Sequence, residues 1–545
     1  MFLMRALNRC LMPLLMAAAP ALWPAPALAQ HEHGHDHPAP EKLGRVHFDN
    51  SCAPKVQETF ARGVALLHSF AYGEATRSFE QVAAKDPRCA MAQWGLAMSR
   101  FHVIWGPATE PDFEAGRAAA GKAAQIAATA RERDYITAIG AFYEGEKIAH
   151  AARVAAFEKA MAGVARRYPQ DHEAAIFHAL SLLGVAYNAP PDKNYTRQKE
   201  AAGILNGLLP LEPDHPGIAH YMIHSFDYPA LAQLALPAAR AYAKIAPSAP
   251  HALHMPSHIF TRLGMWPESI ESNLASARVG QEWIAKSHPG ATSYETLHAM
   301  DYLEYAYLQM GRDAEAKDLV EKAAKVERLN APEFSAGYAL AAIPARYTLE
   351  RRAWKEAADL EVRPISYPWE KYPYAEAITH FARAVGGARS GDLDTARRAV
   401  ARLAAIQVAL QGGKGFDWAS QVEVQRRAAS AWIARAEGKN AEAMTLMRSA
   451  ADLEDSTDKH PVTPGAVLPA REQLGDLLME LGRGEAALAE YETSLKSAPA
   501  RFNSYEGAER AARGAGQDQK QRTFHEQLMA LCGGSLPARA PLPSR

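Results

Sequence analysis

The sequence has little net charge of either sign. It contains 60 lysines and arginines against 61 aspartates and glutamates, which gives a formal net charge of −1 over 545 residues. Nucleic acids and anionic membranes are bound through an excess of basic side chains, so this balance argues against either as the main partner. After the N-terminal segment, no stretch reaches about 18 uncharged apolar residues, so we expect no membrane span.

Several common catalytic motifs are also missing. The sequence contains no HExxH, no GxSxG, no P-loop and no CxxC. The first absence argues against the zincin protease mechanism, and the others remove the nucleophile elbow, the phosphate loop and the dithiol motif. Runs with a period of two residues are nearly absent as well, which predicts an all-α fold.

The first 29 residues have the features of a Sec signal peptide. Arg5 and Arg9 precede an apolar stretch that ends in Ala27, Leu28 and Ala29. Small residues at that position are typical of a cleavage site. We therefore predict residues 1–29 to be a signal peptide, cleaved near Ala29, and the mature protein to be periplasmic or secreted.

Cysteine is scarce, with four residues in the chain, of which Cys10 lies in the signal peptide. In an oxidising compartment Cys52 and Cys89 can close a loop across the first helical pair. Such a disulfide stabilises a protein by about 3 to 4 kcal/mol on the loop-entropy model. We predict this pairing, which leaves Cys532 without an intramolecular partner.

The mature N-terminus is rich in histidine. Residues 30–42, QHEHGHDHPAPEK, contain four histidines and no apolar residue that could form a core. We predict that residues 30–50 form a flexible His-rich arm and that residues 51–545 form the folded part. Such a tract binds metal ions weakly and promiscuously, which suits delivery or buffering better than catalysis.

Two segments match the spacing of tetratricopeptide (TPR) repeats. This repeat needs small residues near positions 8 and 20, where its two helices approach, and proline near position 32. The first match supplies these residues as Gly63, Ala75 and Pro87, with bulky Phe79 at position 24. The clearest match, near the C-terminus, supplies them as Gly475, Ala487 and Pro499, with Tyr491 at position 24.

Partial copies lie between these two segments. They pair Gly311 with Ala316, Gly391 with Ala396, and Gly438 with Ala443. Gly391 and Gly438 are 47 residues apart, and the matching glycine of the C-terminal copy follows Gly438 by 44 residues, so the array is irregular. We predict a TPR-type solenoid of helical hairpins that curves into a right-handed superhelix with a concave groove.

Histidines concentrate in the middle of the chain, within residues 217–301. His220 and His224 are four residues apart, which places both imidazoles on one helix face. His254 and His258 repeat the spacing, with His251 one turn earlier, and Pro256 between them predicts that a helix begins there.

His298 and Asp301 follow on one face of the next helix. We predict a metal site made of the following residues: His220, His224, His254, His258, His298 and Asp301. A four-ligand N/O site suits zinc, copper or iron, and nearby Met222 and Met255 favour copper slightly. The same polar groups could instead recognise an extended peptide.

Three histidines outside this segment are less distinctive. His68 and His102 are interpreted as structural residues. His460 lies in a loop rich in charges and turn formers that could line the mouth of the groove. The proline- and aromatic-rich segment 361–374 is expected to be an ordered connection that lies against the superhelix.

Six segments resemble those of large, exported bacterial TPR proteins of poorly defined function: LLHSFAYGEA, DPRCAMAQWGLAMS, HYMIHSFDYP, HALHMPSHIFTRLGMW, PARYTLERRAW and KHPVTPGAVLPAREQLGDLL. The most specific elements are HMPSHI, from His254 to Ile259, and HYxIH, which contains His220 and His224. The resemblance implies the fold and export, and it brings no established substrate. Some proteins of the family that this chain resembles carry a histidine where this chain has Asp301. Histidine and aspartate can both bind a metal, so this exchange preserves a metal ligand.

Three functions remain open from the sequence. The first is an exported TPR scaffold that binds a protein or peptide and holds a divalent transition metal, copper or zinc before iron. The second is a metalloenzyme that uses the same histidines with an open coordination position, and with Asp301 or Glu304 as base. The third is a TPR interaction module without metal.

Overall fold

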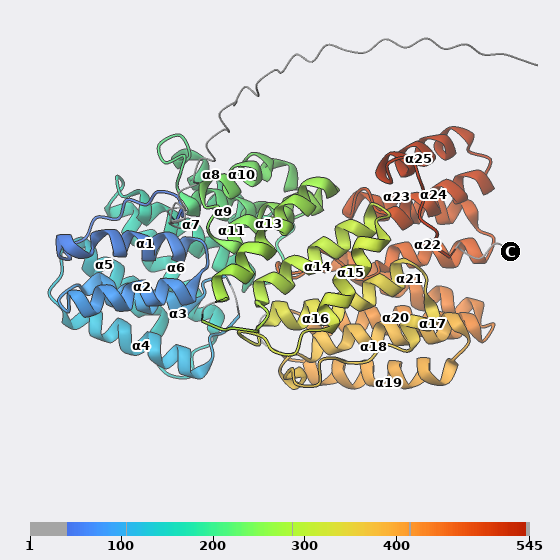
Figure 1. The fold of residues 1–545 in the computed structure, drawn as a ribbon, viewed down its shortest axis with the longest axis horizontal. Coiled ribbons are helices and arrows are strands. Elements are labelled where there is room, and N and C mark those ends of the chain that lie inside the picture. Colours follow the sequence, from blue (N-terminus) through green and yellow to red (C-terminus); the bar gives the residue numbers. More distant parts are fainter. Residues whose placement is uncertain (1–40, 105, 286, 414–415, 541–545) are drawn as a thin grey trace, which may run out of the picture. The chain divides into compact units, whose positions relative to one another are not determined.

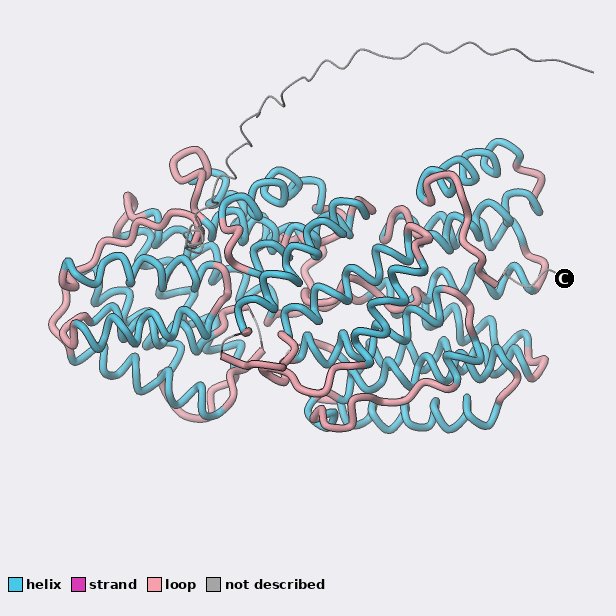
Figure 2. Tube along the Cα trace, in the orientation of Figure 1, coloured by secondary structure: helices cyan, strands magenta, loops and turns pink. Residues whose placement is uncertain are grey.

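Helices make up nearly all of the regular structure. The computed structural model describes residues 41–540 except 105, 286, 414 and 415, so the predicted signal peptide and residues 30–40 of the arm lie outside the described residues. Within this part of the chain the only strand pairing is an isolated bridge between Thr292 and Leu329 (Figure 2). The predicted all-α fold is confirmed.

The first eleven described helices extend from residue 54 to residue 245 and include the beginning of the His-rich segment (Figure 1). In chain order they are η1 (Pro54–Val56), α1 (Gln57–His68), α2 (Tyr72–Lys85), α3 (Ala90–Phe101), α4 (Glu110–Gln125), α5 (Ala130–Tyr143), α6 (His150–Arg167), α7 (His172–Tyr187), α8 (Thr196–Leu208), α9 (Pro216–Phe226) and α10 (Ala232–Ile245).

The remaining helices follow in the same manner. They are α11 (Pro250–His254), α12 (Pro256–Arg262), α13 (Trp266–Ile284), α14 (Tyr294–Gln309), α15 (Asp313–Ala324), α16 (Phe334–Glu350), α17 (Trp354–Ala358), η2 (Trp369–Lys371), α18 (Pro373–Ser390), α19 (Leu393–Leu410), α20 (Trp418–Ala436), α21 (Asn440–Ser456), α22 (Ala470–Glu480), α23 (Gly484–Ser497), α24 (Phe502–Gly514) and α25 (Asp518–Leu531).

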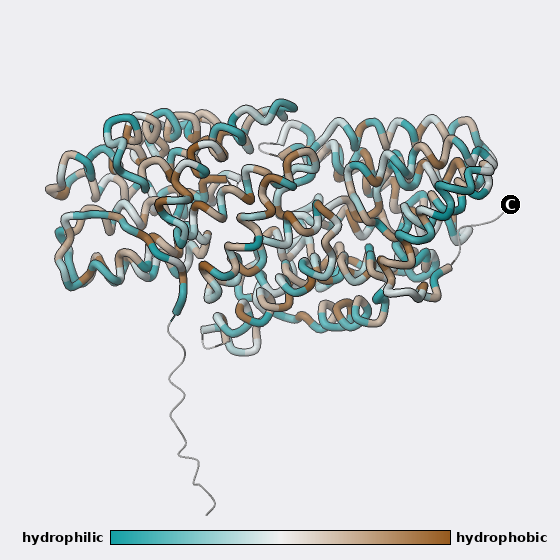
Figure 3. The backbone as a smooth tube through the Cα atoms, turned by 90° about the horizontal axis from the view of Figure 1, so that it is seen from above, coloured by the Kyte–Doolittle hydropathy of each residue, from teal (hydrophilic) through white to brown (hydrophobic). Residues whose placement is uncertain are grey.

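Consecutive helices pack as hairpins, and the hairpins stack. The pairs include α1 with α2, α3 with α4, α18 with α19, α20 with α21, and α22 with α23. The first helices of neighbouring hairpins also contact one another from α14 through α16, α18, α20 and α22 to α24. Along many of the helices hydrophilic and hydrophobic residues are interspersed (Figure 3), as in helices that bury one side against the next hairpin.

At each of the two matching repeats, a pair of glycines makes room for one large aromatic ring. A Cβ atom at Gly63 or Gly95 would lie 2.9 or 2.4 Å from the ring of Phe79, so this ring fits between α1 and α3 only because both positions are glycine. Tyr491 fits between Gly475 and Gly507 in the same way, at 2.8 and 2.3 Å. The predicted repeat positions are therefore confirmed at both ends of the array.

The last residues of the predicted arm are packed, contrary to our expectation. Leu43 and Phe48, inside the segment 30–50 that we assigned to a flexible arm, are buried. The ring of Phe48 contacts those of Trp94 and Tyr135 at centroid distances of 5.1 and 5.0 Å. The described residues 42–50 thus belong to the folded part, because two apolar side chains anchor them to the first core.

The predicted disulfide is present. Cys52 and Cys89 are bonded, with their Cα atoms 4.7 Å apart, and Cys532 is unpaired and half-buried. The connection at 361–374 is ordered as predicted, since Tyr367 and Trp369 are buried. No described helix is both long and apolar enough to cross a membrane.

Buried apolar residues form two clusters. One extends over residues 43–260 and the other over residues 266–512. The histidine-rich helices α9, α11 and α12 stand at the end of the first cluster, and α14 belongs to the second. The polar centre described next therefore lies where the two cores meet.

Candidate metal centre

Helix α9 presents the first histidine pair. Pro216 occupies the first turn of α9, where a missing amide hydrogen costs nothing, and all residues of the helix are buried. His220 Nε2 lies 3.1 Å from His224 Nε2 and 3.1 Å from His251 Nε2 on α11. Three ring nitrogens from two helices thus converge on one point.

A second triad lies on the next helices. Helix α11 ends at His254 and α12 begins at Pro256, as the sequence predicted, but the residues before the proline are themselves helical and Met255 keeps helical angles. His254 and His258 therefore remain one turn apart, with their Nε2 atoms separated by 3.0 Å. His298 of α14 completes the group, whose ligand atoms all lie within 4.8 Å of one another.

The five predicted histidines come together, although as two groups. His220 and His224 join His251, and His254 and His258 join His298. The groups adjoin, since ring centroids of His224 and His258 are 6.4 Å apart and those of His251 and His254 are 6.3 Å apart. His251 was noticed in the sequence only as a neighbour, and its spacing of three residues before His254 was the available signal.

Hydrogen bonds on the far side of the rings define the proton positions in the second triad. His254 Nδ1 lies 2.6 Å from Asn273 Oδ1, and the amide of Asn273 donates in turn to the Ser269 carbonyl oxygen at 2.8 Å. His258 Nδ1 lies 3.0 Å from Asp227 Oδ2. Both partners are acceptors, so each histidine carries its proton on Nδ1.

This arrangement leaves two lone pairs facing each other. With the protons on Nδ1, the Nε2 atoms of His254 and His258 are both acceptors, and no hydrogen lies between them. Two acceptors 3.0 Å apart in a buried site repel unless a cation lies between them. Nitrogen ligands of one tetrahedral zinc or copper ion, with bonds of about 2.0 Å, are separated by about 3.3 Å.

In the first triad one histidine is held in the same way as His254 and His258. His220 Nδ1 donates to the carbonyl oxygen of His68 at 2.6 Å, because a carbonyl can only accept. His220 Nε2 is therefore an acceptor, and two further imidazole nitrogens approach it at 3.1 Å. Metal-bound histidines typically donate their other N–H to a carbonyl or carboxylate in this manner.

Burial keeps these imidazoles neutral. Burial, reinforced by the neighbouring imidazoles, lowers the pKa of His220, His224, His251, His254 and His298 well below 6.5. Burial also lowers the pKa of His258, against the opposing effect of the Asp227 carboxylate. The neutral ring is the form that binds a metal.

Asp301 does not join the histidines. Its Oδ1 atom accepts from Arg346 Nη1 at 2.7 Å, and Glu304 accepts from the same nitrogen at 2.8 Å. Burial raises the pKa of both carboxyl groups, against the attraction of the guanidinium. Both carboxyl groups are paired with Arg346 of α16 and not grouped with the histidines, so neither Asp301 nor Glu304 is placed as we predicted.

Asp227 connects the second triad with the loop between α21 and α22, residues 457–469. Its Oδ2 atom accepts from both His258 and Lys459, the latter at 2.9 Å, and its Oδ1 atom accepts from Arg262 at 3.0 Å. The attraction of these two cations outweighs burial and holds the pKa of Asp227 well below its usual range. Burial lowers the pKa of Lys459 to about 8.

Two aromatic residues border the triads. Tyr302 lies one turn after His298, with its hydroxyl 3.4 Å from His258, and it donates to the Val462 carbonyl oxygen at 3.2 Å. Phe70 adopts a left-handed backbone conformation (φ of 53°) and packs its ring against His220, with centroids 4.3 Å apart. A strained non-glycine residue of this kind persists only where its surroundings enforce it, and such residues cluster at functional sites.

A third buried group has a different character. Glu173 accepts from His68 Nε2 at 2.9 Å and from His215 Nε2 at 3.0 Å. His68 Nδ1 lies 2.8 Å from the hydroxyl of Tyr221, and the Gly217 amide donates to His215 Nδ1 at 3.1 Å. Every contact in this group contains a proton, so it needs no metal, and the structural interpretation of His68 holds.

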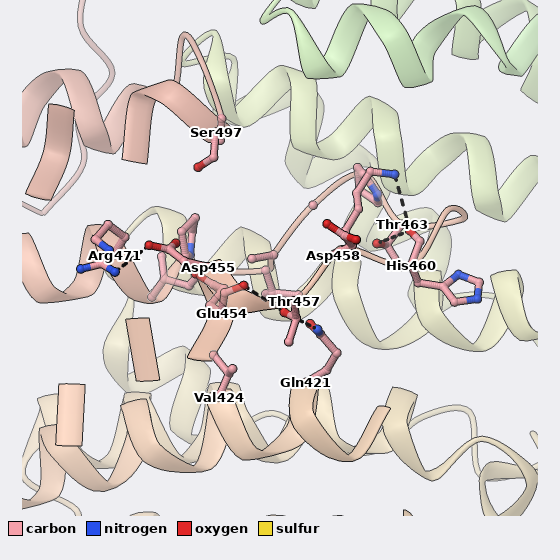
Figure 4. Close-up of a pocket in the computed structure, with 18 of the residues that line it drawn as sticks. Gln421, Val424, Glu454, Asp455, Thr457, Asp458, His460, Thr463, Arg471 and Ser497 are labelled. Atoms are coloured by element: carbon pink, nitrogen blue, oxygen red, sulfur yellow. Dashed lines mark hydrogen bonds and ion pairs between the residues drawn. The ribbon is translucent and has the colours of Figure 1, made fainter. Parts of the chain in front are cut away.

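Two cavities flank Lys459. One has a volume of about 570 Å³ and is lined by aromatic residues that include Trp266, Tyr338 and Trp418. The other, of about 700 Å³, reaches Asp227 and Tyr187. Figure 4 shows the first cavity, where His460 and Thr463 lie on the 457–469 loop and Gln421 bonds to Thr457. His460 lines this cavity, as the sequence suggested.

Comparison with known proteins supports no family assignment. No protein-family model matches the chain, and no curated protein matches it. Among solved structures the chain is similar to yeast Tom70, with a TM-score of 0.33 and 10% identity over 87% of this chain and 99% of that one. It is also similar to the APC/C hetero-tetramer Cut9–Hcn1, with a TM-score of 0.29 and 11% identity over 89% of this chain and 95% of that one.

The TPR domain of P58(IPK) gives 0.20 and 12% identity, over 86% of this chain and 99% of that one. These TM-scores are low. The assignment to TPR-type hairpins therefore rests on the packing described above, and we infer no function from these proteins.

Proposed function

We propose that this protein is a metalloenzyme in which six histidines hold two transition-metal ions, one in each triad. The observation that carries the proposal is the pair of buried, unprotonated Nε2 atoms of His254 and His258, which face each other at 3.0 Å. Each triad provides three protein ligands and leaves a coordination position open. Open positions are typical of catalytic sites, whereas structural sites are closed by four ligands.

The ligand set restricts the choice of metal. Six imidazoles without a thiolate or a carboxylate suit copper or zinc, and iron less well, whereas magnesium and calcium prefer oxygen ligands. A metal ion bound there would supply a Lewis acid and a water molecule of lowered pKa. The chain's own contribution is to hold the imidazoles of His220, His254 and His258, through His68, Asn273 and Asp227 respectively, in the tautomer that binds metal.

Export remains part of the proposal. The Cys52–Cys89 disulfide supports it, because disulfides persist in oxidising compartments and are rare in the cytosol. The signal peptide and the His-rich arm remain predictions from the sequence. In the exported protein, the arm would collect metal for the triads.

The test is the metal content of the full chain with the four arm histidines replaced by serine. After growth in metal-replete medium and removal of loosely bound ions, we expect about two equivalents of transition metal per chain. Less than about 0.2 equivalents would exclude both this function and a metal-holding scaffold. The matched control is the unmodified chain, which measures the contribution of the arm.

A protein or peptide partner is our second candidate, and the aromatic cavity favours it. The indole of Trp418 stacks on the ring of Tyr374, with centroids 4.2 Å apart, and on His460. A wall of this kind, bordered by charged groups, suits an extended peptide. We expect binding to a library of extended peptides to be lost in Trp418→Ala and kept in Trp354→Ala; binding that is indifferent to Trp418 would rule the cavity out.

A further inference from the structure

We propose that the two triads form one centre, in which the two metal ions share a single hydroxide taken from solvent. The proposal rests on the metal function proposed above. It adds that the ions act on one exogenous ligand together instead of occupying independent sites. Three features of the described residues support it: the spacing of the rings, the charge balance and the access from solvent.

The spacing of the rings joins the triads into one cluster. Within a triad, ring centroids lie between 4.2 Å, for His254 and His298, and 6.5 Å, for His258 and His298. Between the triads, His251 and His254 are 6.3 Å apart and His224 and His258 are 6.4 Å apart. These two separations between the triads thus fall within the range found inside them.

The charge balance requires an anion. Two divalent ions held by six neutral imidazoles add four positive charges to a buried site. The carboxylate that bonds to a ligand, Asp227, is already shared by Lys459 and Arg262, so this trio contributes a net charge of +1. Two further carboxylates, Asp301 and Glu304, share Arg346 and carry a formal charge of −1 together with it, which offsets the +1 and leaves the charge of the two ions uncompensated. A small anion from solvent is left to lower the electrostatic cost.

Access from solvent limits the size of that anion. His220, His224, His254 and His258 are buried, whereas His251 and His298, one in each triad, are partly exposed. One histidine of each triad is therefore in partial contact with solvent. Water can enter there, lose a proton to bulk solvent because two cations lower its pKa, and remain as a hydroxide between the ions.

Paired ions of this kind are well suited to one class of chemistry. In two-metal sites the ions lie about 3.5 to 4 Å apart and act on both sides of a shared oxygen atom. The expected substrate is therefore a small molecule that replaces the hydroxide. Its larger part would extend along the partly exposed side chains of His251 and His298.

The probe for this centre is Cu²⁺, because its unpaired electron reports whether a second ion is coupled to it. We load the full chain, with the arm histidines replaced by serine, and measure copper content and the electron paramagnetic resonance (EPR) signal together. We expect about two copper ions per chain and a signal that accounts for only a small fraction of them. X-ray absorption should show a second copper ion within about 4 Å.

Single-triad variants provide the complement. His251→Ala and His298→Ala should each retain about one copper ion, whose signal now accounts for all the bound metal. His380→Ala is the matched control, since this half-buried histidine pairs with Glu376 on α18 and belongs to neither triad. It should behave like the parent protein.

The outcomes separate the two proposals. Two copper ions with a full signal for both would overturn the shared ligand and leave the metal function standing. One ion per chain in the parent protein would also overturn it. Failure to bind any copper would overturn both. If a variant does not fold, the signal and the copper–copper distance of the parent protein still decide the matter.

Discussion

Two buried groups in this protein bring histidine side chains to nearly the same distances from one another. The contacts inside the two groups are chemically opposite. In the group of His68, Glu173 and His215, each short contact joins a donor to an acceptor. In the group of His254, His258 and His298, the shortest contact joins two acceptors. Proximity alone is similar in both, since each group's ligand atoms lie within 4.8 Å.

The difference lies in what the outer nitrogens contact. His254 and His258 donate their Nδ1 hydrogens to Asn273 and Asp227, which lie outside the triad. His68 and His215 direct theirs inward, to the carboxylate of Glu173. A cluster of histidines is thus a candidate metal site when its protons point outward, and a hydrogen-bonded core when they point inward.

Removing a ligand should have the largest effect. We expect His254→Ala to weaken metal binding in its triad more than about 100-fold, since loss of second-shell partners alone costs about 10- to 100-fold. His215→Ala removes a histidine from the other group and should leave metal affinity within about twofold. Competition with a coloured chelator measures both, and equal losses in the two variants would contradict the distinction.

Removing the acceptor of the hydrogen-bonded group should affect folding instead. Glu173→Gln leaves one of the two imidazole N–H groups facing the amide nitrogen, which cannot accept a hydrogen bond, at a cost of about 3 kcal/mol. Urea unfolding of the metal-free protein gives the stability, and atomic emission gives the metal content. We expect the stability to fall and the metal content to stay unchanged.

Lowering the pH should also distinguish the two groups, through a smaller change in the stability of the protein. Burial alone would raise the pKa of Glu173, but the imidazoles of His68 and His215 outweigh it and lower the pKa from 4.5 to about 2. The carboxylate therefore contributes stability that is complete above pH 4.5 and is lost as the pH falls towards 2, roughly 3 kcal/mol in total.

The measurement is unfolding of the metal-free protein at a series of pH values in that window. The Glu173→Gln variant lacks this titration, so its stability should depend less steeply on pH than that of the parent. Parallel curves for the two proteins would show that Glu173 is not held as an ion.

The second shell should have the smallest effect. Asp227→Asn keeps an oxygen for His258 but removes the charge, and we expect metal affinity to fall about 10- to 100-fold. Asp458→Asn, which removes an ion pair with Lys193 and lies next to Lys459 in the 457–469 loop, is the control and should have no effect. If both substitutions weaken binding alike, the loop acts through its charge and not through His258.

Much of the scaffold could be predicted because its signals are local. Gly63 with Phe79 and Gly475 with Tyr491 lie within single repeats, so spacing alone identified them. Residues 42–50 could not be assigned correctly, because Phe48 is anchored by Trp94 and Tyr135 far along the chain. Local composition says nothing about such contacts.

The site was predictable where histidines lie one helical turn apart in the sequence. His220 with His224, and His254 with His258, follow from a spacing of four residues. Asp227, Asn273 and Lys459 come from three other elements and left no pattern in the sequence. Asp301 misled us because a spacing of three residues permits a shared face, and the packing of α14 between α12 and α16 divides that face.

The most direct test is a crystal of the copper- or zinc-loaded protein, examined by anomalous scattering at the absorption edge of the metal. We predict one peak in each triad, bound by Nε2 atoms at about 2.0 to 2.1 Å, and no peak beside Glu173. A peak between His68, Glu173 and His215, or triads that stay empty in loaded crystals, would contradict the account.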